Sequence, residues 1–455
     1  MKDSNQQKHK LTFIDLFAGL GGFNFALSEL GFECVFASEL KEDLRTLYTI
    51  NFPGIEIRGD ITQIDPMSVP AHDILCAGFP CQPFSQAGKR QGFEDEKDRG
   101  NLFFWIVKIL NAKKPKYIIL ENVANLENHD EGNTWNRISE ELDEAGYWID
   151  KRILSPHQFG IPQHRKRIYI IGIDKNKGSR EDLRYPNPTN RPCDIRTIIN
   201  IKDKDIIPIK PETREQLRIW EEFLRRTYEN DGALPSFPIW AMEFGANYDF
   251  EELAPAYQSL EQLQGKRGNM GRLIDGETLE ECLEELPVYA LTDKTKTFPK
   301  WKISYIKQNR EFYERNKEWL DVWLQQVQDY ENSHLKIEWN CGADTEPSLY
   351  DKIIQYRASG IRIKLPTYSP ALNLVGTQIP IFPWVPLSDE PDENGQILYG
   401  RYMTVKEAAK LQGMRKLKTG NKRKRFQMSN ARLYEALGNA VNVDIVKKIA
   451  EAFIK

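Results

Sequence analysis

The first part of the chain, up to about Asp174, alternates short apolar runs with helical patterns, and this alternation limits the fold more than any other feature. The apolar runs are rich in β-branched or aromatic residues and nearly continuous, as buried parallel strands are. They read LTFIDLF, ECVFASE, DILCAGF, KYIILENV and RIYIIGI. Stretches between them, such as GFNFALSEL and NLFFWIVKIL, predict helices. The pattern predicts a doubly wound α/β sheet with helices on both faces.

The character of the sequence changes near RYPNPTNRP (residues 184–192), where the density of proline suggests a domain boundary or linker. Beyond it, REQLRIWEEFLRR and NKEWLDVWLQQVQDY predict amphipathic helices. We expect their tryptophans, Trp220, Trp319 and Trp323, to lie in a hydrophobic core rather than at a ligand site. Short β-like runs broken by proline and glycine follow from residue 353 to 386, and the last residues return to helix.

Composition excludes several classes of protein. Hydrophobic residues make up 40% of the chain and charged residues 28%, as in an ordinary globular protein. No apolar run reaches the roughly 18 residues of a membrane span, and the polar N-terminus lacks a signal core, so we expect a cytoplasmic protein. Six cysteines in a chain of 455 residues do not make a disulfide scaffold, and none of them forms a CxxC pair, so a zinc site has no support.

Charge gives only a weak indication of a partner. The net charge of -3 does not by itself suggest nucleic acid. HRKR (residues 164–167) and RKLKTGNKRKR (residues 415–425) are local basic clusters. Taken alone, such clusters are more often a solvated surface than a binding site.

A glycine-rich turn between a predicted strand and helix, in FIDLFAGLGGFNFAL, is a candidate ligand loop. Its glycines let the backbone turn tightly and approach a ligand. Glu39 ends the next strand, about 20 residues on, and suits hydrogen bonding to a ribose. Asp60 and Ile61 end a third segment and could hold an adenine edge. NAD, FAD and S-adenosylmethionine sites share such loops, and a structural turn also explains the glycines, but together these features favour an adenosine-type ligand.

Cys81, in the turn GFPCQPFS, follows a predicted strand end. Free cysteine is often buried and inert, but ligand crevices form at this edge of α/β sheets. A nucleophilic thiol needs an acid or base partner. Glu121 and Asn122 close KYIILENV, and a buried carboxyl there can keep a raised pKa and donate a proton.

Arg165 and Arg167 lie in QHRKR, just before a predicted strand. Because they are two residues apart, extended chain would place both side chains on one face. Guanidinium groups in that position could hold a carboxylate or a phosphate. Each of the residues at these strand ends has a structural explanation as good as its functional one. As a set they converge on one crevice.

These motifs closely resemble those of the DNA (cytosine-5) methyltransferases, particularly those of bacterial restriction–modification systems. In the family's order, the matching motifs are DLFAGLGG, ASEL, GDI, GFPCQPFS, ENV, QHRKR, TVKEAAKLQGM and GNAV. The resemblance implies a Rossmann-like S-adenosylmethionine-dependent methyltransferase domain at residues 1–185, completed by a C-terminal helix at 430–455. It also implies a smaller, irregular α+β target-recognition domain within residues 186–429, where the family resemblance is loose apart from SGIRIKLPTYSPALNLVGTQIPI.

The resemblance implies methyl transfer from S-adenosyl-L-methionine to C5 of a cytosine within a specific double-stranded DNA sequence. Cys81 would attack C6, Glu121 would engage the N3 side of the ring and supply a proton, and Asn122 would help hold the Glu121 loop. Arg165 would steady the base, with Arg167 beside it. The base would have to be flipped out of the duplex first.

The residues that bind the cofactor and the DNA follow from the same resemblance. The expected cofactor contacts are Phe17, Gly19, Leu20, Gly22, Glu39, Asp60, Ile61, Pro80, Leu102, Asn439 and Ala440. The loop after Cys81 could be a merely disordered surface loop, but the resemblance favours a mobile lid that closes over DNA. The expected DNA contacts are Ser85, Lys89, Arg90, Arg362 and Lys364.

Two other functions stay open. A tRNA cytosine-C5 methyltransferase shares the core motifs, but the large region between QHRKR and TVKEAAKLQGM favours sequence-specific DNA. A catalytically silent DNA-binding regulator is disfavoured by the presence of Cys81, Glu121 and Arg165. We expect a monomeric, DNA-associated bacterial protein, and family habit suggests a cognate restriction endonuclease in the same system. The recognition sequence cannot be read from these residues.

Overall fold

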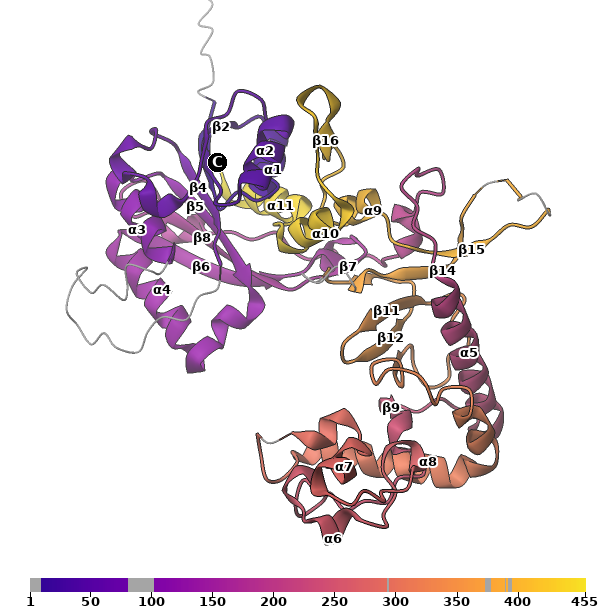
Figure 1. Cartoon of the computed structure of the whole chain (residues 1–455). Coiled ribbons are helices and arrows are strands. Elements are labelled where there is room, and N and C mark those ends of the chain that lie inside the picture. The colour runs from indigo at the N-terminus through magenta and orange to yellow at the C-terminus, as the bar shows by residue number, and fades with distance from the viewer. Residues whose placement is uncertain (1–9, 81–101, 293, 373–377, 389, 392–394) are drawn as a thin grey trace, which may run out of the picture. The chain divides into compact units, whose positions relative to one another are not determined.

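The computed structural model describes residues 10–80, 102–292, 294–372, 378–388, 390–391 and 395–455 (Figure 1). These residues form two compact units. Unit 1 comprises the described residues within 1–199, 367–376 and 405–455, and unit 2 comprises those within 200–366 and 377–404.

Unit 1 is built on a seven-stranded sheet with the strand order β3-β2-β1-β4-β5-β8-β6. The strands are β1 (Thr12–Leu16), β2 (Glu33–Ser38), β3 (Ile57–Arg58), β4 (Ile74–Gly78), β5 (Tyr117–Val123), β6 (Tyr147–Leu154) and β8 (Arg167–Asp174). The pairs from β3 to β5 are parallel, whereas β8 is antiparallel to both β5 and β6. The sheet reverses the strand order at β1, which separates β2 and β3 from β4 and β5, and this is where ligands bind in doubly wound folds.

Helices cover both faces of this sheet (Figure 1). The α-helices described in unit 1 are α1 (Gly22–Glu29), α2 (Glu42–Asn51), α3 (Leu102–Lys113), α4 (Asn133–Glu144), α9 (Val405–Leu411), α10 (Asn430–Asn439) and α11 (Val443–Phe453). Leu75 and Ala77 of β4 share one buried cluster with Phe103 of α3. On the opposite face, the Tyr117 ring of β5 packs edge to face on Phe453 of α11, with centroids 5.1 Å apart. The predicted doubly wound α/β fold is confirmed.

The two antiparallel strands differ from the expectation of parallel pairing. β8 is the predicted run RIYIIGI, and it is buried on both faces, so its composition carries no sign of its direction. β6 was not among the predicted strands. It lies at the edge of the sheet. Its residues alternate between exposed and half-buried, and only Tyr147 and Leu154 at its two ends are buried.

The compact units have boundaries that differ from the expected 1–185, 186–429 and 430–455. Residues 186–199 stay with unit 1, because the amides of Thr189 and Asn190 donate to the carbonyl of Gln158. The helix α9 also belongs to unit 1, since Asn442, at the start of α11, donates from its side chain to the carbonyl of Leu411 at 2.9 Å. The expected C-terminal helix is two helices, α10 and α11. The assignment of a catalytic and a recognition domain stays a prediction.

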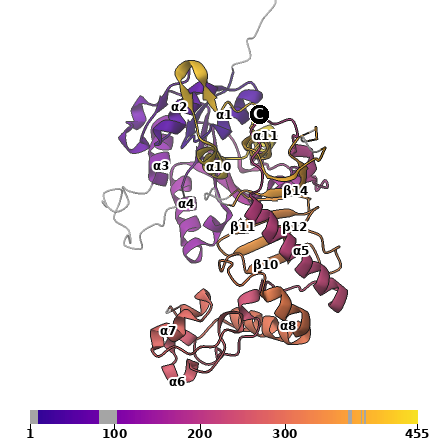
Figure 2. The same cartoon turned by 45° about the vertical axis from the view of Figure 1, so that its right-hand side comes forward.

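Unit 2 contains a mixed six-stranded sheet with the order β15-β14-β11-β12-β10-β9. The strands are β9 (Ile239–Trp240), β10 (Lys336–Asn340), β11 (Ile353–Arg357), β12 (Gly360–Lys364), β14 (Ile381–Pro386) and β15 (Tyr399–Tyr402). The helices are α5 (Pro211–Asp231), which Figure 2 shows beside this sheet, α6 (Leu260–Leu263), α7 (Leu279–Glu284) and α8 (Lys300–Leu324). Trp220 of α5 and Trp323 of α8 are buried with ring centroids 5.0 Å apart, as expected, and Trp319 is partly buried.

Among the described residues, no helix has the length and apolar character needed to cross a membrane. In the same part of the chain, His, Cys, Asp and Glu side chains do not gather in any group of three that could hold a metal ion.

Candidate active site

A pocket of about 460 Å³ lies in unit 1 where β1, β2, β4 and β5 end. Its volume is within the usual range for sites that take a small molecule. The wall consists of Phe17, Ala18, Gly19, Glu39, Leu40, Lys41, Leu44, Gly78, Phe79, Pro80, Leu102, Glu121, Asn122, Val123, Arg165, Arg167, Arg432, Ala436, Asn439, Ala440 and Val441. The pocket therefore brings together two parts of the chain that are far apart in the sequence, residues 17–167 and residues 432–441.

The glycine turn after β1 forms one side of the pocket. Phe17 and Gly19 both have left-handed backbone angles, with φ of 56° and 53°. A β-carbon at Gly19 would meet no atom within 4 Å, so the backbone there borders open space. Its amide donates to Oε2 of Glu39 at 2.9 Å, and the amide of Lys41 donates to Oε1 of Glu39 at the same distance. These bonds fix the Glu39 carboxylate against the turn.

A carboxyl–guanidinium pair, Glu121 and Arg167, forms another part of the pocket wall. Nε of Arg167 lies 3.2 Å from Oε1 of Glu121, whose side chain is 8% exposed. Burial raises the pKa of Glu121, and the charges of Arg167 and Arg165 oppose that rise without cancelling it. A carboxyl with a raised pKa keeps its proton to higher pH and can act as an acid.

Arg165 is buried and bonded to the main chain of the C-terminal segment. Its Nη1 donates to the carbonyl of Gly438 at 2.8 Å and its Nη2 to the carbonyl of Ala440 at 3.0 Å. Burial lowers the pKa of Arg165 to about 10, so it remains charged at neutral pH. Its Nε has no hydrogen-bond partner among the described residues. Arg165 thus fixes the position of the chain around Asn439, which lines the pocket.

Asn122 connects the ends of two neighbouring strands. Its Nδ2 donates to the carbonyl of Phe79 at 2.9 Å, and its Oδ1 accepts from the amide of Val123 at 2.8 Å. Phe79 immediately precedes Pro80, which lines the pocket. The side chain of Asn122 therefore holds the end of β5 beside the chain that leads to Cys81.

Several expected contacts do not line the pocket. Leu20 is buried in the protein, and Gly22 begins α1 against the carbonyl of Val441. Asp60 caps a short 3-10 helix, accepting from the amide of Thr62 at 2.9 Å, and Ile61 lies in the hydrophobic core. Their assignment to the cofactor stays a prediction.

The other expected residues lie elsewhere or outside the description. Cys81, Ser85, Lys89 and Arg90 lie outside the described residues. Arg362 and Lys364 are on β12 of unit 2, where Arg362 pairs with Glu338 at 3.4 Å. Burial, and secondarily the charge of Arg362, lowers the pKa of Lys364.

Sequence reasoning missed a group of pocket residues on α2, on α10 and in the turn before α2. They include Leu40 and Lys41 of the turn, Leu44 of α2, and Arg432 and Ala436 of α10. Arg432 and Ala436 could have been predicted from the helical repeat. They precede Asn439 by seven and three residues and therefore lie on the same face of the helix.

Comparison with known proteins gives a match to the C-5 cytosine-specific DNA methylase family over residues 11–455. The Type II methyltransferase M.HhaI of Haemophilus parahaemolyticus is 46% identical over 184 residues, which are 40% of this chain and 55% of that protein. The Type II methyltransferase M.NlaX of Neisseria lactamica is 42% identical over 233 residues, 49% of this chain and 69% of that protein. The chain spans about half the length of the first curated relatives it matches.

Solved structures resemble the chain over most of its length. A Spodoptera frugiperda DNMT2 variant aligns with a TM-score of 0.48 and 18% identity, covering 98% of this chain and 100% of its own. A putative DNA modification methyltransferase encoded in an E. coli prophage aligns with a TM-score of 0.47 and 16% identity, covering 97% and 98%.

Proposed function

Because the chain belongs to the C-5 cytosine-specific DNA methylase family, we propose that it methylates C5 of a cytosine within a specific double-stranded DNA sequence. The family uses S-adenosyl-L-methionine as its methyl donor. The observation that supports the proposal most is the pocket itself, in which the Glu39-bound glycine turn and the Glu121–Arg167 pair face one cavity. One pocket would thus hold both the nucleoside part of the cofactor and an acid.

The pocket fits this cofactor. Gly19 leaves open space next to a backbone turn, as close approach by a ligand requires. Glu39 would accept from ribose hydroxyls, while Leu102 and Phe17 would supply apolar contact, and Asn439 would close the pocket. When bound, S-adenosyl-L-methionine would supply an electrophilic methyl group.

The catalytic residues of the proposal have distinct tasks. Glu121, with its raised pKa, would donate a proton at the N3 side of the target ring. Cys81, which directly follows the pocket residue Pro80 in the chain, would bond to C6 as a thiolate and make C5 nucleophilic. Loss of the C5 proton after methylation would then break the Cys81–C6 bond. Arg165 or Arg167 would steady the base.

The finer parts of the proposal concern partners. Unit 2 would recognise the target sequence, with Arg362 and Lys364 of β12 as phosphate contacts. Ser85, Lys89 and Arg90 would be further DNA contacts. We further propose a monomer that acts on DNA in a bacterial cytoplasm, paired functionally with a cognate restriction endonuclease. Binding to DNA would weaken with added salt, since neutralised phosphates release counterions.

A methyl-transfer assay tests the proposal. Tritiated S-adenosyl-L-methionine would be supplied to the full chain with duplex DNA, with tRNA or with neither. Label on duplex DNA alone is expected, whereas label on tRNA alone would favour the RNA-directed alternative and no label a silent regulator. Cys81→Ser should abolish transfer, and the matched control Cys34→Ser should retain it. Bisulfite sequencing of DNA from expressing cells would give the recognition sequence.

A further inference from the structure

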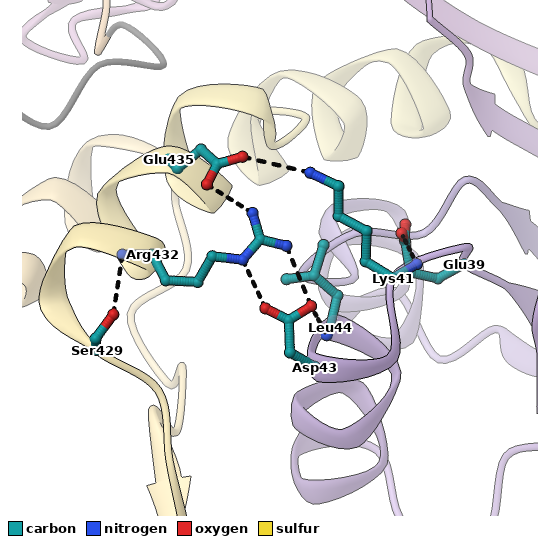
Figure 3. Close-up of polar contacts among 7 residues, drawn as sticks. All are labelled: Glu39, Lys41, Asp43, Leu44, Ser429, Arg432 and Glu435. Atoms are coloured by element: carbon teal, nitrogen blue, oxygen red, sulfur yellow. Dashed lines mark hydrogen bonds and ion pairs between the residues drawn. The ribbon is translucent and has the colours of Figure 1, made fainter.

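An ion network at the pocket wall joins two helices that are far apart in the sequence (Figure 3). Arg432 of α10 binds Asp43 of α2 with two bonds, from Nε to Oδ2 at 2.6 Å and from Nη2 to Oδ1 at 3.1 Å. Its third nitrogen, Nη1, lies 2.7 Å from Oε2 of Glu435. Glu435 also pairs with Lys41 at 3.3 Å. These four residues are called the rim network.

The rim network is continuous with the pocket on both sides. Lys41 and Arg432 themselves line the pocket, and Leu44, the neighbour of Asp43, does so too. On α10, Arg432 lies on the same face as Ala436 and Asn439, which are further pocket residues. The carboxylate of Asp43 is not part of the pocket wall. It nevertheless fixes the distance between the two helices that form that wall.

An arginine near each end of α10 bonds this helix to the rest of unit 1. Near its C-terminal end, the carbonyls of Gly438 and Ala440 accept from Arg165, which is 2% exposed. Near its N-terminal end, Arg432 binds Asp43, with side-chain exposures of 20% and 40%. The first attachment is excluded from water, whereas the second is partly open to it. Opening of the pocket at this wall would therefore break the rim network first.

We propose that the rim network controls how long the cofactor stays in this pocket, by holding the N-terminal half of α10 against α2. Arg432 and Asp43 are then positioning residues, which act through the pocket walls on α2 and α10. The inference rests on the proposed function in one respect, that the pocket takes S-adenosyl-L-methionine. It adds that release requires the α2 and α10 walls to separate.

Release of the cofactor from the full chain, without DNA, is the measurement. Dissociation of S-adenosyl-L-methionine would be followed by stopped flow for the wild type, Asp43→Asn, Arg432→Met and the double variant, at low and high salt. Asp43→Asn is the decisive variant, because its side chain does not line the pocket. Glu29→Gln is the matched control, since Glu29 pairs with Lys447 of α11 at 3.3 Å and joins α1 to the C-terminal region away from the pocket wall. Thermal melting would verify that each variant is folded.

Each single variant is expected to release the cofactor about fivefold faster, the factor that about 1 kcal/mol represents for a partly exposed ion pair. The double variant should match the singles, because residues that act through one contact are not additive. Salt should accelerate release from the wild type, by screening the network, and should accelerate release from the double variant less, because only the Lys41–Glu435 pair remains there to be screened. Glu29→Gln should release at the wild-type rate.

Two results would overturn the inference: unchanged release from Asp43→Asn and Arg432→Met, or equal acceleration by Glu29→Gln. In the first case the rim network would only stabilise the fold, and melting temperature alone would respond. Neither result would affect the proposed function, which is tested by methyl transfer to DNA. Conversely, a wild-type chain that binds the cofactor but transfers no methyl group would contradict the proposed function and leave the release rates interpretable.

Discussion

Arg165 donates from Nη1 to the main-chain carbonyl of Gly438 at 2.8 Å, across 273 residues of sequence. With the bond to the Ala440 carbonyl, this contact fastens the C-terminal segment to the end of the sheet. Arg165→Lys can replace at most part of this geometry, so we expect the unfolding free energy to fall by about 1–3 kcal/mol. Calorimetric melting of the full chain would measure the loss.

The matched control for that substitution is Arg218→Lys on α5. Arg218 is 53% exposed and pairs with Glu215 on its own helix at 2.8 Å. Its replacement should change stability by less than about 0.5 kcal/mol, as for other exposed pairs. Equal losses for the two variants would mean that the buried carbonyl contacts contribute nothing special.

The raised pKa of Glu121 predicts that the difference in unfolding free energy between the wild type and Glu121→Gln depends on pH. Burial raises the pKa of Glu121 in the folded chain, so folding favours its protonated form. Its contribution to stability is therefore fully present below the unfolded pKa and is lost as the pH rises through the folded pKa, by about 1.4 kcal/mol for each unit between the two values. Glutamine does not titrate.

Denaturation of both proteins from pH 4 to pH 8 would test this sign. At pH 4 the unfolding free energy of the wild type should approach or exceed that of Glu121→Gln. As the pH rises, it should fall relative to that of the variant. A wild-type advantage that grows with pH would show that the arginines, rather than burial, dominate the environment of this carboxyl.

Gly22→Ala should disturb the pocket by displacing the C-terminal segment that packs on Gly22. A β-carbon at Gly22 would lie 2.6 Å from the main-chain oxygen of Val441, a pocket residue. Because a backbone atom cannot rotate away, the C-terminal segment must shift, at a cost of about 1–3 kcal/mol. We expect lower stability together with weaker cofactor binding, measured by calorimetry. Gly59→Ala is the control, since its β-carbon would meet only Arg45 at 3.7 Å, and equal effects would contradict the explanation.

Three cysteines are expected to resist alkylation in the native chain. Burial raises the pKa of Cys34 and of Cys341 to about 12 and that of Cys76 well above its usual value. Since the thiolate is the reactive form, iodoacetamide at pH 8 should leave all three unmodified until urea unfolds the protein. Peptide mass spectrometry would locate the label, and early labelling of Cys76 would be inconsistent with its burial in β4.

Much of the fold could be predicted because its signals are local. Continuous apolar runs such as DILCAGF become central strands wherever both faces are covered, and the alternation with helices predicts the doubly wound sheet. The antiparallel direction of β8 could not be predicted, because a fully buried strand looks the same in either direction. The unit boundary just before α9 could not be predicted either. The assignment of α9 to unit 1 depends on a tertiary hydrogen bond from the Asn442 side chain to the Leu411 carbonyl.

The sequence by itself determined which chemical groups stand at the ends of the strands, since a strand end is a local feature. Glu39, Glu121 and Pro80 all line the pocket for this reason. Only the tertiary structure decided how the two arginines are used, with Arg167 facing Glu121 and Arg165 bonded to the C-terminal main chain. It also decided that Arg432 forms part of the pocket wall. Such pairings depend on how distant segments pack, and no local pattern encodes that distance.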